Sequence, residues 1–291
     1  MVRKRGIFMS SRQNILDKIC MLYDSFFEQE KKVASYIMKN HRQVINMTIN
    51  DLAKECGTSI ATVTRFCKKC DVDGFHHLKI SLAKEIVESD DDIVASNSIS
   101  EGSFEQSLNN ILANKIRELE QTVSLINTND LKSILEVIKN ARIVQFVAVG
   151  NTIPVAIDGV YRFNEIGIKA VSSTIWETQL AFSMSLDKDD VMIAISNSGE
   201  SKKVFTMVEE AKSRGVKTIG ITNNPNSNIA NIVDYHIQTV TREKLFLDEF
   251  YFSRISAMTV VEILYILLAA DDKNSYNILS ACENLMANEK V

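Results

Sequence analysis

The sequence predicts an all-α N-terminal domain followed by an α/β C-terminal domain with a doubly wound, mostly parallel sheet. A length of 291 residues favours two domains over one. Residues 15–87 show helical apolar spacing, whereas from residue 143 onward short apolar runs alternate with helical patterns, as in βαβ units. An acidic, Ser-rich stretch separates the two parts. We therefore expect domains at residues 1–87 and 104–291, joined by a linker at 88–103.

The composition is that of a soluble globular protein. Hydrophobic residues make up 45% of the chain and charged residues 24%. The longest apolar run, residues 263–270, is far shorter than the roughly 18 residues that cross a bilayer. The basic N-terminus lacks the apolar segment of a signal peptide, and five cysteines are an odd, low count that suits reduced thiols. We expect a cytoplasmic protein with no membrane partner.

Charge is distributed unevenly along the chain. Residues 1–85 hold 15 Lys and Arg against 9 Asp and Glu, a net charge of +6, and the remainder holds 18 against 28, a net charge of −10. These values sum to the −4 of the whole chain. The asymmetry indicates that only the first part meets a polyanion, although a mixed solvated surface would also explain so small a surplus.

Residues 15–40 predict two helices, and the next segment predicts a helical pair with a tight turn. Thr48 and Asp51 form a capping-box-like start. Gly57 is placed to end that helix in the left-handed conformation, and Ser59 can cap the following helix. Another helix is expected from residue 76 to residue 87.

The helical pair has the spacing of a helix-turn-helix unit at Ala53, Gly57, Val63 and Phe66. The small alanine lets the helices approach, the glycine turns the chain, and the two apolar side chains fill the crossing. Hydroxyls and cations on the second helix are suited to base edges and phosphates of a double-stranded DNA operator. The alternative is a plain helical hairpin with a polar outside. The candidate DNA-binding residues are Ser59, Thr62, Thr64, Arg65, Lys68 and Lys69.

The same helix contains a Cys-x-x-Cys at Cys67 and Cys70. A zinc site needs four ligands, and Cys56, His76 and His77 are near in sequence. A single Cys-x-x-Cys inside a helix more often serves packing, so we expect no metal here.

The second part of the chain predicts helices and strands in alternation. Helices are expected at 104–126 and from residue 130, strands at 143–149, 169–171, 191–195, 218–222 and 235–238, and intervening helices at 157–166, 176–184 and 202–214. Terminal helices are expected at 249–270 and 275–287.

Two loops rich in small polar residues follow strands of this sheet. The strand Val191–Ile195 runs directly into Ser196–Ser201, which leads into an amphipathic helix, and Gly150–Thr152 follows the strand at 143–149. Ligands of such sheets bind beyond the carboxyl ends of the strands, and free N–H groups at a helix N-terminus attract phosphate. The alternative is an ordinary loop with serine as a helix cap. Lys202 and Lys203 either add charge or are simply solvated. The candidate ligand residues are Gly150, Asn151, Thr152, Ser196, Asn197, Ser198, Gly199 and Ser201.

At these residues the chain resembles the sugar isomerase (SIS) domain. The matching pieces are Ile193–Ser201, Ala211–Gly215 and Ile219–Asn223. With residues 30–37, Ser59–Lys69 and Gly74-Phe75, nearly the whole chain resembles an RpiR-type transcriptional regulator. The resemblance implies a DNA-binding domain governed by an SIS-type domain that binds a phosphosugar.

The resemblance also implies roles for single residues. Thr152, Ser196, Ser198 and Ser201 would contact the phosphate, and Glu243 and Arg254 match positions that line or support the site. The chain departs from the family where Gly-x-Gly-x-Ser is replaced by Ala148-Val149-Gly150-Asn151-Thr152, since Thr keeps a hydroxyl but adds a methyl group. Aromatic side chains that would reshape the pocket or line a dimer interface stand at Phe246, Phe250, Tyr251 and Phe252.

We therefore expect a phosphosugar-responsive transcriptional regulator of carbohydrate metabolism that is not an enzyme, needs no cofactor, and forms a homodimer or homotetramer on its operator. One alternative is a sugar-phosphate isomerase, which would require a positioned acid/base pair. Another is a regulator whose sugar pocket no longer functions.

Overall fold

The protein was analysed as a computed structural model, which describes residues 15–89, 102–241 and 253–270 together with residues 277–278, 280–281 and 284–285. The chain forms two compact units, and the division between them falls after Lys115, within helix α6 (Phe104–Leu125). Most of the predicted linker at 88–103 lies outside the described residues, so the proposed domain limits stay a prediction.

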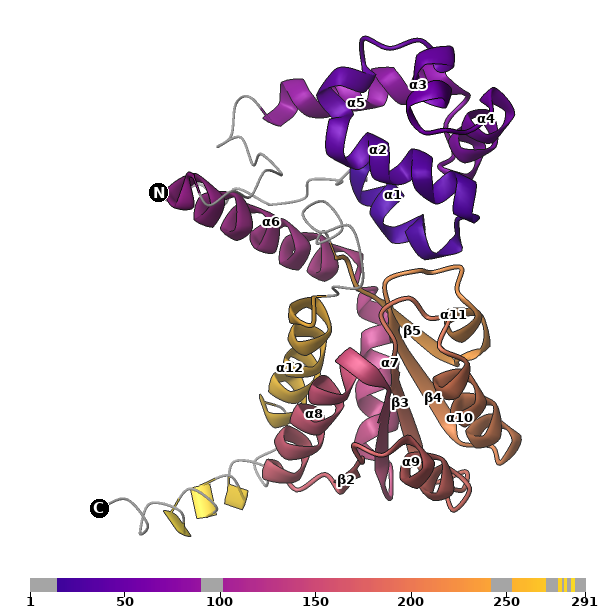
Figure 1. Ribbon diagram of the computed structural model, residues 1–291. Helices are drawn as coiled ribbons and strands as arrows, with labels where there is room; N and C mark the ends of the chain where they lie inside the picture. The colour runs from indigo at the N-terminus through magenta and orange to yellow at the C-terminus, as the bar shows by residue number, and fades with distance from the viewer. Residues whose placement is uncertain are drawn as a thin grey trace. The chain divides into compact units, whose positions relative to one another are not determined.

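The first unit is helical, as predicted (Figure 1). Helix α2 packs against each of the other four α-helices, and its Val33 and Ile37 are fully buried. The helices between residues 15 and 89 are α1 (Ile15–Leu22), the short 3-10 helix η1 (Tyr23–Ser25), α2 (Glu28–Val44), α3 (Ile49–Glu55), α4 (Ile60–Lys69) and α5 (Phe75–Ser89).

The second unit is built on a five-stranded sheet in which every pair of neighbours is parallel and the order is β2-β1-β3-β4-β5. The order reverses direction between β1 and β3, which is the switch point of a doubly wound fold. The predicted fold class is confirmed. The strands are β1 (Val144–Ala148), β2 (Ala170–Val171), β3 (Val191–Ile195), β4 (Lys217–Thr222) and β5 (Tyr235–Gln238).

Helices cover both faces of this sheet, and the strand side chains alternate between the two (Figure 1). On β3, Val191, Ile193 and Ile195 face one side, whereas Met192 and Ala194 face the other, because successive strand residues point in opposite directions. One side is covered by α7 (Thr128–Lys139), α8 (Ile153–Glu165) and α12 (Ile255–Ala270), and the other by α9 (Trp176–Ser183), α10 (Lys202–Ser213) and α11 (Asn228–Ile232).

The helices of the described ranges include none with the length and apolar character needed to cross a membrane.

The edge strand β5 is joined to β4 by the carboxylate of Asp234. Its Oδ2 atom accepts hydrogen bonds from the N–H and the hydroxyl of Thr218, at 2.8 and 2.9 Å, and Lys212 lies 3.5 Å from Oδ1. Burial by itself raises the pKa of this carboxyl, but the two Thr218 hydrogen bonds and the nearby lysines outweigh it and lower the pKa below the usual value. The ionised form therefore stabilises the fold.

We expect Asp234→Asn to destabilise the protein at neutral pH and to flatten its acid response. A depressed pKa contributes stability that is present above the unfolded value, about 4, and is lost as the pH falls through the folded pKa. Urea unfolding from pH 7 to pH 3 should show the gap between wild type and variant closing below about pH 4. The exposed Glu177→Gln serves as the control. A gap that is constant across this range would contradict the assigned role of the carboxylate.

Candidate functional site

Helices α3 and α4 are fixed by local hydrogen bonds that were predicted from the sequence. Thr48 Oγ1 accepts from the N–H of Asp51 at 3.2 Å, and Asp51 Oδ2 accepts from the N–H of Thr48 at 2.9 Å, which completes a capping box. Gly57 has φ of +60°, and Ser59 Oγ accepts from the N–H of Thr62 at 3.2 Å. The turn between the helices is thus held at both ends.

The packing between the two helices also agrees with the predicted helix-turn-helix unit. Ala53 is 4% exposed, and Val63 and Phe66 are fully buried in the core of the first unit. The side chains that remain on the outside of α4 can face a partner such as the major groove of DNA.

The six predicted DNA-binding residues are not all on this outer face. Ser59, Arg65 and Lys68 are exposed and Thr64 is half-buried. Thr62 is only 4% exposed, and its hydroxyl lies 3.0 Å from that of Ser59. Thr62 therefore belongs to the cap of α4.

Lys69 is held by partners within the first unit. Its Nζ lies 2.6 Å from Oε2 of Glu30, a carboxylate that is 2% exposed, and 4.2 Å from the centre of the Phe27 ring. The same Glu30 oxygen accepts the N–H of Phe27 at 2.9 Å. Lys69 therefore joins the end of α4 to the start of α2. Without it, the buried Glu30 carboxylate would keep an unpaired charge, which is costly.

The Cys-x-x-Cys is buried. Cys67 and Cys70 are inaccessible, and burial raises the pKa of these thiols to about 11 and about 12. The thiols stay protonated at neutral pH, and thiols in apolar surroundings are poor metal ligands. In the ranges that the structure describes, no three His, Cys, Asp or Glu side chains are placed to hold a metal ion.

In the second unit, the two predicted ligand loops lie together at the carboxyl edge of the sheet. Strands β1 and β3 are neighbours in register, with Ala148 beside Ile195. Thr152 connects the loops directly, because its hydroxyl donates to the carbonyl of Val149 at 3.0 Å and to that of Ile195 at 3.1 Å. The proton of Thr152 is therefore engaged by backbone carbonyls, so in this structure its hydroxyl has no proton to donate to a phosphate.

The turn Ser196–Ser201 is braced by the segment that follows β4. The carbonyl of Asn197 accepts the N–H of Asn223 at 2.8 Å, and the carbonyl of Gly199 accepts the N–H of Ile229 at 3.1 Å. The Glu200 carboxylate accepts the N–H of Asn228 at 3.2 Å. These contacts hold two carbonyls and the one carboxylate of the turn against the segment Asn223–Ile229.

What remains on the turn is a set of neutral donors beside a helix N-terminus. Helix α10 begins at Lys202, so the N–H groups of its first turn lack intrahelical acceptors. Ser201, its N-cap residue, makes no side-chain capping bond in this loop, and Ser198 Oγ accepts the N–H of Glu200 at 3.2 Å. Lys203 lies over the Trp176 ring at 4.7 Å. Such a group of donors can bind an anion.

Sequence reasoning missed Gln179, which holds the end of β1. This side chain is 1% exposed, and its amide accepts the N–H of Ala148 at 2.9 Å and donates to the carbonyl of Ala148 at 2.9 Å. It thereby completes the hydrogen bonding of β1 where the two-residue β2 ends, just before Gly150. Its only sequence signal is a glutamine on the inner face of a helix.

Asn223 was also missed. It is 2% exposed, and its amide nitrogen donates to Thr241 Oγ1 at 3.3 Å. Its Oδ1 and the Nδ2 of Asn197 are buried without a hydrogen-bond partner among the described residues. The two residues are joined by their backbone hydrogen bond, and each side chain keeps one buried amide atom unpaired.

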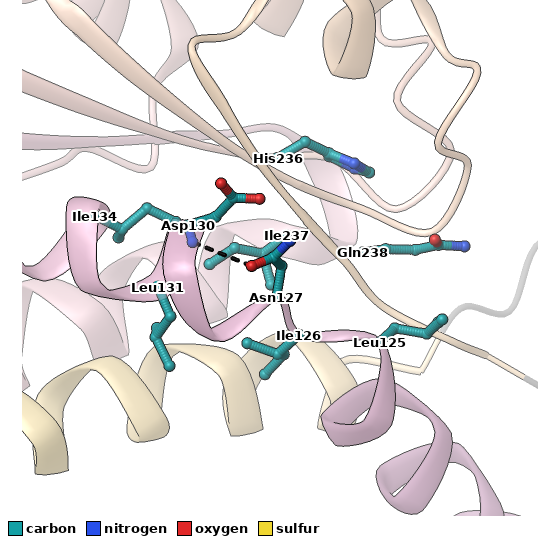
Figure 2. A pocket seen from close by; sticks show the side chains of 9 residues that line it. All are labelled: Leu125, Ile126, Asn127, Asp130, Leu131, Ile134, His236, Ile237 and Gln238. Carbon is teal, nitrogen blue, oxygen red and sulfur yellow. Dashed lines mark hydrogen bonds between the residues drawn. The ribbon is translucent and has the colours of Figure 1, made fainter. Parts of the chain in front are cut away.

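A separate cavity of about 180 Å³ lies between the start of α7 and β5 (Figure 2). Its lining is mixed: five residues are aliphatic, and the polar ones are Asn127, Asp130, His236 and Gln238. None of the residues that line it comes from the two ligand loops. A carboxylate without a cation disfavours phosphate, so this cavity does not fit the predicted ligand.

His236 on β5 is among the residues that line this cavity, but its ring points to the side of the strand opposite to Ile237 (Figure 2). Its Nε2 lies 2.8 Å from Thr222 Oγ1. Burial lowers the pKa of the imidazole, against the opposing effect of its contact with Thr222. Of the remaining predicted residues, Arg254 is exposed immediately before α12, whereas Glu243 and the aromatic residues 246–252 lie outside the described residues.

A helix-turn-helix unit joined to a doubly wound unit with a polar loop at its switch point defines a two-part DNA-binding regulator. The chain matches the helix-turn-helix domain of the rpiR family over residues 13–89 and the SIS domain over residues 137–267. It is 31% identical over 271 residues to an uncharacterized HTH-type transcriptional regulator of Caldanaerobacter subterraneus subsp. tengcongensis, covering 90% of this chain and 92% of the relative. The chain belongs to the rpiR family of helix-turn-helix transcriptional regulators with an SIS domain.

Solved structures share the fold. The Vibrio vulnificus NanR protein complexed with ManNAc-6P is similar with a TM-score of 0.57 and 21% identity, over 96% of this chain and all of that one. The sugar isomerase domain of an RpiR transcription factor from Sphaerobacter thermophilus has a TM-score of 0.57 and 23% identity, over 62% of this chain and 99% of that one.

We expect Gly199→Ala to destabilise the second unit by about 2–4 kcal/mol, because φ is +71° and a Cβ would lie 2.0 Å from Ser227 Oγ. Gly215→Ala is the matched control, since φ there is +78° but the nearest atom is 3.6 Å away. It should cost only the backbone part, roughly 1–2 kcal/mol. Urea unfolding measures both, and equal costs would show that the turn is not braced against Ser227.

Proposed function

We propose that the protein binds operator DNA through α4 and that a phosphorylated sugar, bound at Gly150–Thr152 and Ser196–Ser201, controls this binding. The observation that carries the ligand half is the turn after β3. Two of its carbonyls and its carboxylate are bonded to the segment Asn223–Ile229, and its hydroxyls stand beside the N-terminus of α10. This arrangement suits the oxygens of a phosphate.

The sugar part of the ligand is supported by comparison. The structure of NanR, which shares the fold, was solved with ManNAc-6P.

An effector regulates DNA binding only if it binds the DNA-competent and incompetent states with different affinities. The direction of the effect, induction or repression, follows from which state the ligand prefers. As a regulator of this kind, the protein acts on chromosomal DNA in the cytoplasm.

We further propose a homodimer or homotetramer, because paired recognition helices about 34–36 Å apart match a pseudo-palindromic operator. Supporting this, α12 is rich in apolar residues, and its Met258 and Ile266 are exposed at 39% and 53%. On the adjacent α8, Ile157 and Tyr161 are also exposed. Clustered apolar side chains on a surface favour a protein partner.

The protein functions without catalysis in this proposal. A Listeria monocytogenes protein described as a sugar-phosphate isomerase shares the fold, with a TM-score of 0.51 and 20% identity. An isomerase needs an acid/base pair at the reacting carbons. His236, the one histidine in the described part of the second unit, lies within β5 and is bonded to Thr222, and the two ligand loops contain no histidine.

We expect Arg65→Ala to weaken operator binding by about 10- to 100-fold at fixed salt without altering the fold or the oligomer. Arg65 lies on the outer face of α4 with its side chain exposed. Its guanidinium lies 3.4 Å from Oγ1 of the buried Thr62. Lys188→Ala, which removes the same charge from the surface of the second unit, is the control and should bind normally. Equal affinities of the Arg65 variant and wild type would exclude α4 as the reading helix.

We expect Ser198→Ala to abolish thermal stabilisation by the cognate sugar phosphate. A ligand at a hundredfold excess over its Kd stabilises by about 2.7 kcal/mol, which raises Tm by about 5–11 °C for a folding unit of about 150–250 residues. Ser213→Ala removes a hydroxyl from the other end of α10 and should keep the shift. A panel of sugar phosphates that leaves the wild-type Tm unchanged would favour a regulator with a non-functional pocket.

A further inference from the structure

The hydroxyl groups in the N-terminal half of α4 are used inside the protein. Thr64 Oγ1 donates to the carbonyl of Ile60 at 3.0 Å. Ser59 and Thr62 pair with each other at 3.0 Å, and Ser59 Oγ also accepts the N–H of Thr62. Thr62 is too buried to reach a ligand. Hydroxyl hydrogen bonding is thus a poor basis for reading bases with this half of the helix.

The outer face of the same half presents apolar surface instead. Ile60, the first residue of α4, is 46% exposed, and the neighbouring Ala61 is also exposed. Among residues 15–85, whose exposure the structure describes, two other large apolar side chains are well exposed, and neither is on α4. They are Phe27, whose ring is covered by the ammonium of Lys69 at 4.2 Å, and Ile80 on α5.

This surface has one complementary group in the major groove. The N-terminal residues of a recognition helix contact base edges. Among those edges only thymine carries a methyl group, and the other major-groove groups are donors and acceptors that an aliphatic side chain leaves unpaired. A β-branched side chain at the first position of α4 is therefore matched to thymine.

We propose that Ile60, with the methyl group of Ala61 beside it, is a specificity-determining residue that contacts the C5 methyl of a thymine in each operator half-site. This proposal rests on the proposed function, because it requires α4 to be the reading helix. Arg65 and Lys68 then supply the polar and phosphate contacts on the same outer face.

The test replaces thymine by uracil, which removes only the methyl group and keeps base pairing. The probe is a duplex that the full-length protein selects from a random library. Each symmetric pair of thymines is exchanged in turn, and affinity is measured at one salt concentration for wild type, Ile60→Ala and Ile80→Ala. The last is the matched control, since Ile80 is 40% exposed in the same unit.

For wild type, uracil at one symmetric pair should reduce affinity about fourfold per half-site, the value of one buried methyl group. Ile60→Ala should bind the thymine duplex more weakly by at least that factor and should be indifferent to uracil at that pair. Ile80→Ala should behave as wild type at every position. Unchanged thermal unfolding of Ile60→Ala shows that its fold is intact.

Three results overturn the proposal. They are a selected duplex without a preferred thymine, a uracil scan that is flat for wild type, and an Ile60→Ala variant as sensitive to uracil as wild type. The Arg65→Ala variant shows whether such a result contradicts only the role of Ile60 or also the proposed function. If it binds the selected duplex as wild type does, α4 is not the reader, whereas if it binds weakly, only the role of Ile60 is wrong.

Discussion

The pairing of the turn after β3 with the segment after β4 is the interaction on which the second unit's candidate site depends. A turn cannot leave buried peptide groups unpaired without a cost in free energy. Here the N–H groups of Asn223 and Ile229 donate hydrogen bonds to the carbonyls of Asn197 and Gly199. The close approach that this requires leaves no room for a side chain at Gly199, which lies against Ser227. Because β1 and β3 are neighbouring parallel strands, the loops that follow them begin at the same edge, and Thr152 bonds its loop to the end of β3.

A comparable constraint in the first unit is the buried carboxylate of Glu30. It accepts a hydrogen bond from the N–H of Phe27 and pairs with the ammonium of Lys69. Without these partners the buried charge would be costly. Lys69 therefore fixes the C-terminal end of α4, while the Ser59 cap fixes its beginning. The helix is held at both ends by residues that the sequence marked as DNA ligands. The exposed face of α4 is consequently less polar than the composition of the helix suggests. Its exposed residues are Ile60, Ala61, Arg65 and Lys68.

Features governed by near neighbours could be predicted from the sequence, and those governed by distant partners could not. The capping box at Thr48, the left-handed Gly57, and the strand at 235–238 each follow from a few consecutive residues, and all are present. The bond from Lys69 to Glu30 spans 39 positions, and that from Gln179 to Ala148 spans 31. The spacing of apolar residues along the chain gives no information about contacts between residues so far apart. Glu243 and the aromatic residues after it, for which the resemblance implied roles, lie outside the described residues.

The chemistry of the candidate site favours a sensor over a catalyst. Enzymes that move protons place a group with a pKa near neutrality beside the reacting atoms. The turn Ser196–Ser201 instead offers backbone N–H groups and hydroxyls, and its one carboxylate, Glu200, is engaged by Asn228. Neutral donors around a helix end supply affinity for a phosphate without a group that would exchange protons with the sugar. A regulator needs reversible occupancy and an unchanged ligand, because only then does the bound fraction follow the concentration of the metabolite. In the proposed function, the hydroxyls and N–H groups of this turn supply that reversible binding.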